Sequence, residues 1–338
     1  MSGDSFLAQA RGGAGRSAGL IGLIVLELVV FSLLSPHFFT FSNLLNVTRL
    51  NAEIGLIALG MAVVIASGGI DLSVGAIVGL SSVMLGVYFQ AGLPLPLAII
   101  MAIVTATACG FLNGLLVVVL RLHPLLVTLG TLSAFRGIAV GMSGGGGFSL
   151  YPDDFIVFGQ SYTAGIPFQT IIWVVAAILV GVVVSRTVSG RSVILVGTSE
   201  EPARLAGVRV GLVRILVYSL SGLLAGISSL IYTSRVFSSR GDAGGGLELL
   251  AIAAVVVGGA SIRGGEISIA RTVLATFAIG LISNGFSLGN LDTSWQYIAV
   301  GALMIAVVVF NELPSIRRAV SRLATSLTPK RERKVSPQ

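Results

Sequence analysis

The sequence is poor in charged residues, in lysine and in cysteine. Only 10% of its 338 residues are charged, whereas roughly a quarter of the residues in an ordinary soluble domain are. Apolar residues make up 54% of the chain, and so few charges could not cover that much apolar surface in water. A soluble fold is therefore excluded, and we expect the chain to lie in lipid.

Residues that commonly carry chemistry are also scarce. Cys109 is the only cysteine, which excludes an internal disulfide and a cysteine metal cluster. The two histidines, His37 and His123, each neighbour a proline and do not form a cluster. No Gly-Lys pair occurs, so the chain lacks the phosphate-binding G-x-x-x-x-G-K-[ST] loop. We therefore expect a non-catalytic chain with no metal and no cofactor.

Long apolar runs recur from one end of the sequence to the other. A bilayer core about 30 Å thick needs roughly 20 apolar residues per helix. Glycine pairs at 68–69, 258–259 and 264–265 interrupt the runs, and inside a membrane such breaks survive where protein or a wet cavity satisfies the backbone. We expect an all-α polytopic membrane protein with about ten transmembrane helices, some broken or re-entrant, at residues 18–35, 50–67, 71–89, 95–120, 124–143, 167–185, 212–232, 247–260, 268–288 and 293–311.

Basic residues are distributed unevenly among the loops. If the N-terminus is cytoplasmic, alternation of ten spans places 17 of the 21 Lys and Arg residues inside and three outside. This predicts a cytoplasmic N-terminal tail at 1–17, a transmembrane domain at 18–312 and a basic cytoplasmic C-terminal tail at 313–338. The net charge of +7 is typical here of a tail beside lipid headgroups, and we expect no nucleic-acid partner.

The densest polar signal is the stretch SGGIDLSVG at 67–75. Gly68 and Gly69 allow backbone angles that end one span. Asp71 is placed to accept from free N–H groups at the start of the next. With Ser73 and Gly75 these residues form a helix-break motif, which the predicted topology places at the cytoplasmic side. A tight capped turn and direct contact with substrate or a partner subunit both fit this pattern.

Polar uncharged residues outnumber charged ones inside the predicted spans. A charge at the centre of a span costs about 2.5–3.5 kcal/mol on insertion scales, and Glu27 and Arg136 are the main examples here. This balance favours a neutral substrate, although hydroxyl and amide groups also serve helix packing. The role of Glu27 stays open. Four residues near expected helix breaks are candidates for lining a substrate path: Asn113, Thr128, Thr131 and Asn284.

Weak internal similarity links two parts of the chain. Residues 61–71 read MAVVIASGGID, and residues 252–265 read IAAVVVGGASIRGG. Transporters often descend from duplicated halves that meet at the substrate site. Apolar helices also resemble each other by chance, so duplication stays an open alternative.

The longest loop predicted inside, residues 186–211, is polar and basic. Residues 200–207 within it are compatible with a short helix, because Pro202 is tolerated in a first turn. The segment fits either a solvated loop or a surface for a partner.

Several of these segments together resemble a known family. GGIDLSVG is similar to a signature of ribose-type monosaccharide ABC transporter permeases, in the branched-chain amino acid/ribose permease superfamily. The resemblance continues at 128–137, 190–197, 201–207, 218–226 and 247–259, and covers roughly residues 40–310. The segments occur in the same order and spacing as in that family, which makes the resemblance specific.

The resemblance implies a permease subunit of an ATP-driven ABC importer in a bacterial plasma (inner) membrane. The cargo would be a monosaccharide or a related neutral polyol. The implied partners are a cytoplasmic ABC ATPase, a second permease subunit (an identical copy or a paralogue) and an extracytoplasmic sugar-binding protein. Residues 200–207 resemble the coupling helix that contacts the ATPase, although Pro202 departs from its pattern. The residues implied in coupling are Glu200, Glu201, Ala203, Arg204 and Gly207.

Two other classes of function compete with this interpretation. A secondary, proton-coupled sugar transporter would use Glu27 or Asp71, but it would not need the polar 186–211 loop. A membrane scaffold without transport would not need so many glycine breaks. The importer subunit is the hypothesis that accounts for both features.

Overall fold

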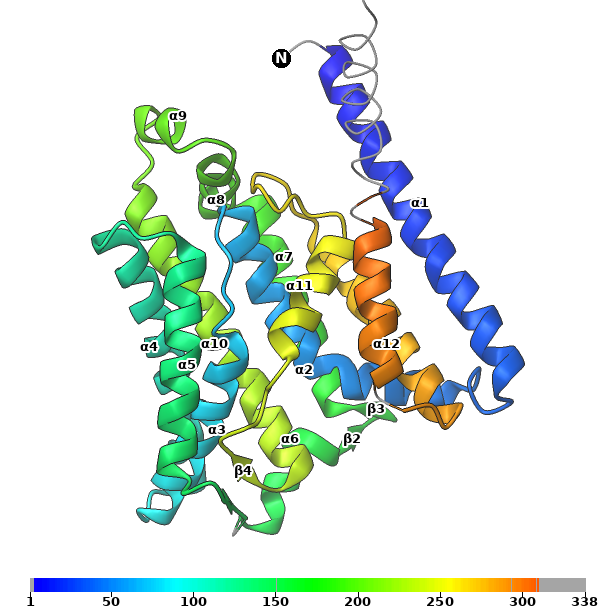
Figure 1. Ribbon diagram of the computed structural model, residues 1–338, viewed down its shortest axis with the longest axis vertical. Coiled ribbons are helices and arrows are strands. Elements are labelled where there is room, and N and C mark those ends of the chain that lie inside the picture. The colour runs from blue at the N-terminus through cyan, green and yellow to red at the C-terminus, as the bar shows by residue number, and fades with distance from the viewer. Residues whose placement is uncertain (1–2, 150, 293, 308, 310–338) are drawn as a thin grey trace, which may run out of the picture.

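The structure is a computed structural model that describes residues 3–149, 151–292, 294–307 and 309, and the predicted tail at 313–338 lies outside these residues. Helices dominate the chain (Figure 1). The long ones are α1 (Gly3–Leu34), α2 (Phe41–Ala66), α3 (Val74–Gln90), α4 (Leu95–Val119), α5 (Pro124–Met142), α7 (Phe168–Arg186), α10 (Val210–Val236) and α12 (Ile269–Leu288). The shorter elements are β1 (Gly147–Phe148), η1 (Asp153–Ile156), α6 (Val157–Gln160), β2 (Tyr162–Thr163), β3 (Ile166–Pro167), α8 (Val188–Thr198), α9 (Glu200–Leu205), β4 (Ser239–Arg240), α11 (Leu247–Val257) and a last helix, Ser294–Val307.

Among the described residues, seven helices are long and apolar enough to cross a membrane: α1, α2, α4, α5, α7, α10 and α12. Three shorter apolar helices, namely α3, α11 and Ser294–Val307, lie at the three remaining predicted spans. The 11 residues of α11 cover only about 17 Å at the rise of an α-helix. The expected polytopic all-α fold is confirmed, and the short helices match the expectation that some spans are broken.

Segments predicted to face the cytoplasm lie at one end of the molecule. Figure 1 shows the start of α1, α8 and α9 at the upper end, and β2, β4 and α6 toward the lower end. The strands pair in two small antiparallel ladders, β1 with β4 and β2 with β3. The upper end is therefore the predicted inner side, and its assignment to the cytoplasm stays a prediction.

α2 forms the core of the bundle. In its apolar window 89% of the residues are buried, against 17% in α1 and 22% in α7. A helix that is apolar around its whole circumference is buried by other helices, and α10, α12, α11 and α7 all contact α2. The apolar outer faces of α1, α4, α5 and α7 are left for lipid or for another protein.

A buried ion pair also joins α2 to α10. The Glu53 side chain is only 5% exposed, and Arg235 Nε donates to its Oε1 at 2.7 Å. A second bond runs from Arg235 Nη2 to Oε2 at 3.2 Å. This two-pronged geometry offsets part of the cost of burying a carboxylate, and it fixes how far α10 lies along α2.

α4 and α10 pack with their backbones in close contact. A Cβ added to Gly110 would overlap the carbonyl oxygen of Tyr218, and one added to Gly222 would overlap that of Ala106. Gly114 and Gly226 continue this pattern one turn along their helices. Small residues four positions apart are the usual means by which membrane helices approach this closely.

Replacing Gly110 by alanine should therefore lower the free energy of unfolding by about 1–3 kcal/mol, the usual cost of overpacking. Thermal unfolding of the purified chain in detergent measures this change. Gly137→Ala on α5 is the matched control, since nothing lies within 4 Å of a Cβ added there. The control should be neutral or slightly stabilising. Equal losses in both variants would contradict this account of the α4–α10 contact.

The 186–211 segment contains more helix than the sequence indicated. α8 forms after Thr187, whose Oγ1 accepts from the Gly190 N–H at 3.2 Å. Val193 and Val196 of α8 are buried, so this predicted loop partly packs against the bundle. The overall composition of the segment is polar, so it did not indicate that α8 within it is amphipathic.

The two similar segments, 61–71 and 252–265, meet beside α8. The Gly265 N–H donates to the Ala66 carbonyl at 3.0 Å. A Cβ on Gly197 of α8 would overlap that same carbonyl. The two segments thus contact each other at the end of α2, and the question of duplication stays open.

Candidate functional site

The helix-break motif begins at the end of α2, beside α8, and its acidic residue is buried within the bundle. Asp71 follows the end of α2 and is 0% exposed. Its Oδ1 accepts from the N–H and the hydroxyl of Ser73, at 3.1 and 2.6 Å. Its Oδ2 accepts from Ser221 Oγ of α10 at 3.0 Å. Asp71 therefore holds the residue that precedes α3, as the motif predicted, and also ties the break to α10.

Asn113 and Thr128 reach the same break from two other helices. Asn113 Nδ2 on α4 donates to Ser73 Oγ at 2.7 Å. Thr128 Oγ1 on α5 donates to the Ile70 carbonyl at 3.2 Å, and the Tyr218 hydroxyl donates to it at 3.3 Å. Backbone groups freed by the break thus find partners on α4, α5 and α10, which is what non-helical chain in a membrane requires.

The motif glycines allow neighbouring segments to approach. Gly68 has a φ of 83°, in the left-handed region that favours glycine. Gly69 packs against the ring of Tyr218, and Gly75 packs against the loop before α11, so that a side chain at either position would collide. The break and the start of α11 are therefore in direct contact.

Of the other two candidate path residues, Thr131 adjoins this network, because its Oγ1 donates to the Thr128 carbonyl at 3.4 Å, whereas Asn284 lies apart from it. Thr131 is one turn further along α5 and is 9% exposed. Asn284 on α12 pairs with Asn43 in the first turn of α2, through reciprocal amide bonds of 2.7 and 3.0 Å. Since α2 has 26 residues, its two ends lie about 39 Å apart. Asn113 and Thr128 are thus brought together, whereas Asn284 is not.

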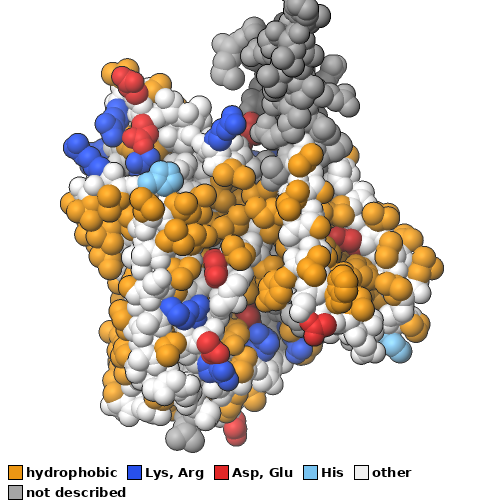
Figure 2. All heavy atoms as spheres, in the orientation of Figure 1, with side chains coloured by type: hydrophobic (Ala, Val, Ile, Leu, Met, Phe, Trp, Pro, Cys, Tyr) orange, Lys and Arg blue, Asp and Glu red, His pale blue; other side chains and the backbone are white. Residues whose placement is uncertain are grey.

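Two charged residues, one on α5 and one at the start of α11, were not among the predicted site residues. Arg136 Nη1 on α5 donates to the carbonyls of Gly241 and Ala243, at 2.8 and 2.7 Å. Glu248 Oε1 accepts from the Gly246 N–H at 3.3 Å. Both side chains are partly exposed, and Figure 2 shows charged side chains within the lower part of a largely apolar face. The sequence did offer one indication of this site, because an arginine inside a predicted span is rare and usually functional.

Glu27 on α1 is 6% exposed, and neither carboxylate oxygen has a hydrogen-bond partner among the described residues. No hydrogen bond among the described residues joins it to the network around Asp71. In the part of the chain that the structure describes, no group of three or more His, Cys, Asp or Glu residues could hold a metal ion.

The predicted coupling segment forms α9, with Pro202 in its first turn. The helix ends two residues earlier than the predicted segment, at Leu205, and a glycine closes it: Gly207 has a φ of 80° and its N–H donates to the Arg204 carbonyl at 3.0 Å. The Val208 N–H donates to the Ala203 carbonyl at 3.0 Å, which completes the usual glycine-terminated helix end. This geometry accounts for a glycine at that spacing.

The side chains of α9 divide between the protein and the solvent. Ala203 is fully buried. Glu200 pairs with Arg204 at 3.3 Å and with Arg214 of α10. Glu201 is exposed, and Leu205 is 86% exposed. α9 is thus held against the protein by its buried alanine and its ion pair to α10, and it exposes Glu201 and Leu205 to solvent.

Comparison with known proteins identifies several relatives. A family model described as "Branched-chain amino acid transport system / permease component" matches residues 43–308. The chain is 37% identical to "Ribose import permease protein RbsC" of Bacillus subtilis (strain 168) over 297 residues, covering 87% of this chain and 92% of the relative. It is 34% identical to "Autoinducer 2 import system permease protein LsrD" of Escherichia coli (strain K12) over 312 residues, covering 90% and 94%. No solved structure matches the chain.

Proposed function

The chain belongs to the family of branched-chain amino acid transport system permease components, and from this premise we propose that it is the membrane subunit of an ATP-driven sugar importer. Its cargo would be a monosaccharide or a related neutral polyol. The observation that carries the proposal is a match along nearly the whole chain to two import permeases, whose names specify ribose and autoinducer 2. This family match favours the importer over a proton-coupled carrier.

We assign the energy source to a separate ATPase that contacts α9. The helix is held firmly, since Ala203 is buried and Glu200 pairs with two arginines. A rigid helix at a membrane protein's end suits transmission of movement from a partner into α10, which follows it. An extracytoplasmic sugar-binding protein would deliver the cargo at the opposite end, in a bacterial plasma membrane with both termini cytoplasmic.

The substrate path would run along the face that carries Arg136 and Glu248, completed by a second permease subunit. This face joins the partly exposed start of α11 to α5. Asn113 and Thr128 at the helix break, with Thr131 beside them, would shape the path rather than bind cargo tightly. Asn284 would act separately, at the α2–α12 contact.

Reconstitution into liposomes tests the proposed function. The chain would be combined with its ATPase and its binding protein, and uptake of a labelled sugar would be followed with and without ATP. We expect uptake only when ATP, the ATPase and the binding protein are all present. Uptake that follows a proton gradient in the absence of the ATPase would reject the importer and favour the carrier.

A further inference from the structure

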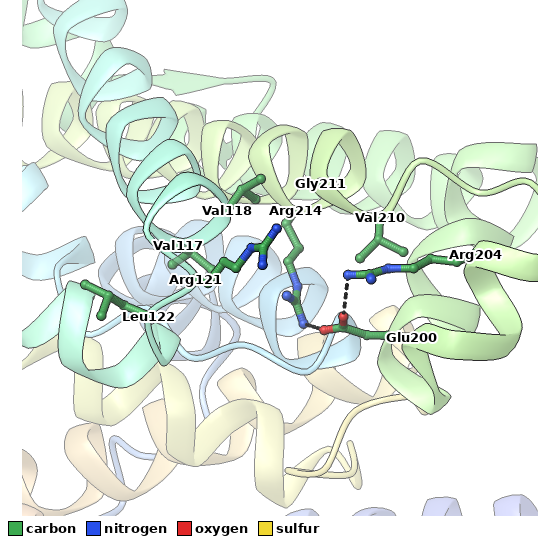
Figure 3. Close-up of a pocket in the computed structure, with 9 residues that line it drawn as sticks. All are labelled: Val117, Val118, Arg121, Leu122, Glu200, Arg204, Val210, Gly211 and Arg214. Carbon is green, nitrogen blue, oxygen red and sulfur yellow. Dashed lines mark hydrogen bonds and ion pairs between the residues drawn. The ribbon is translucent and has the colours of Figure 1, made fainter.

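A cavity of about 380 Å³ lies beneath α9. Three arginines reach it from separate elements: Arg121 from the turn between α4 and α5, Arg204 from α9 and Arg214 from α10. Glu200 is the one acidic residue in its lining (Figure 3). The cavity therefore connects α9 to the body of the protein through charged side chains.

Positive charge exceeds negative charge in this cavity. The two carboxylate oxygens of Glu200 are occupied by Arg204 and Arg214. Arg121 has no hydrogen bond or ion pair among the described residues, and Figure 3 shows its side chain directed toward Arg214. Like charges that converge in this way repel one another unless an anion lies between them.

The backbone of Arg121 is unusual in a way that favours a ligand. Its φ is 52°, in a region that residues with a side chain seldom adopt. It follows the last residues of α4, at a position where helices normally end with glycine. An arginine there costs conformational energy and directs a guanidinium group over the cavity.

Exposed aliphatic side chains lie on both sides of Arg121 in the sequence, and one of them, Leu122, lines the cavity. Val119 is 64% exposed, Leu122 is 45% exposed and Leu126 is 64% exposed. Figure 2 shows basic side chains at the upper left, above a band of hydrophobic ones, in the region of α9 and the α4–α5 turn. In a bilayer that covers this hydrophobic band, the cavity would lie where lipid phosphates meet acyl chains.

We propose that this cavity binds the phosphate of an anionic phospholipid headgroup, with the acyl chains lying along Val119, Leu122 and Leu126. The planar guanidinium group matches the geometry of phosphate oxygens, and basic pockets of membrane proteins at this depth suit anionic lipids. A bound headgroup would link the α4–α5 turn to α9. The inference rests on the chain's position in the membrane and not on the proposed transport.

Native mass spectrometry of the full chain, released from nanodiscs of mixed phosphatidylglycerol and phosphatidylcholine, tests this. The wild-type chain should retain phosphatidylglycerol in preference to phosphatidylcholine. Arg121→Gln should weaken that retention about tenfold, because it removes one charged contact to the phosphate. Arg121 makes no hydrogen bond or ion pair among the described residues. The thermal unfolding of the Arg121→Gln variant in phosphatidylcholine should therefore match that of the wild-type chain.

Arg209→Gln is the matched control, since Arg209 is exposed beside α10 but does not line the cavity. Equal losses of phosphatidylglycerol in the two variants would overturn the proposal. Displacement of the lipid by inorganic phosphate would identify a site for the free ion and would overturn it also. If Arg121→Gln loses ATPase binding but retains the lipid, the cavity binds an acidic group of the ATPase and the lipid proposal is overturned.

Discussion

Replacing Asp71 by alanine is expected to lower the free energy of unfolding by about 3–5 kcal/mol, because three donors lose their acceptor in a buried place. These donors are the N–H and hydroxyl of Ser73 and the hydroxyl of Ser221. Since Ser73 also accepts from Asn113, the loss should spread to α4. The contacts to the Ile70 and Ala66 carbonyls would remain, but the start of α3 would lose its acceptor.

Thermal unfolding of the purified chain, monitored by loss of helical circular dichroism, measures this effect. Asp71→Asn preserves the shape of the side chain and should be less harmful than Asp71→Ala. The matched control is Asp154→Ala, since Asp154 is an exposed acid at the opposite end of the molecule and should have no measurable effect. An Asp71→Ala variant as stable as this control would show that Asp71 does not hold the break.

Reversing the charge of Glu201 by Glu201→Lys is expected to reduce ATP-driven uptake about tenfold or more, the effect of a mismatched charge at a tight contact. Glu201 is exposed, and the pairs that fix α9 involve Glu200 instead. The variant should therefore fold normally and fail only in its contact with the ATPase.

Co-purification of the ATPase with the variant, together with uptake by reconstituted liposomes, checks this prediction. Glu201→Gln should give an intermediate loss, because it removes the charge without reversing it. Asp154→Lys makes the same reversal at the opposite end and should leave the ATPase bound. If Glu201→Lys binds the ATPase and takes up sugar as well as the wild-type chain does, α9 is not the coupling site.

The outline of the fold was predictable because lipid imposes a simple rule on the sequence. Each span must be apolar over its length, and the predicted spans correspond to the helices. The short helix within residues 200–207 was also predictable, since Pro202 fits the first turn of α9. In both cases the information lies within a few neighbouring residues.

The contacts between distant residues were not predictable in the same way. The Asn43–Asn284 pair joins positions 241 residues apart, and no local pattern links them. The bonds that reach the break from α4, α5 and α10 were likewise not predictable, because alternation of spans fixes only their order and not which helices pack together. The start of α11 was missed for a similar reason, since Arg136 finds its partners more than 100 residues away.

The side of the membrane on which α9 lies decides whether an ATPase can reach it. Leu205 is 86% exposed on α9 and Tyr162 is 53% exposed near the opposite end, and Cys109 is the only cysteine to remove. Leu205→Cys and Tyr162→Cys would be placed separately in a Cys109→Ala chain and exposed to a membrane-impermeant maleimide. We predict labelling of Leu205→Cys only in inside-out vesicles and of Tyr162→Cys only in right-side-out vesicles. Labelling of Leu205→Cys in right-side-out vesicles would contradict the account.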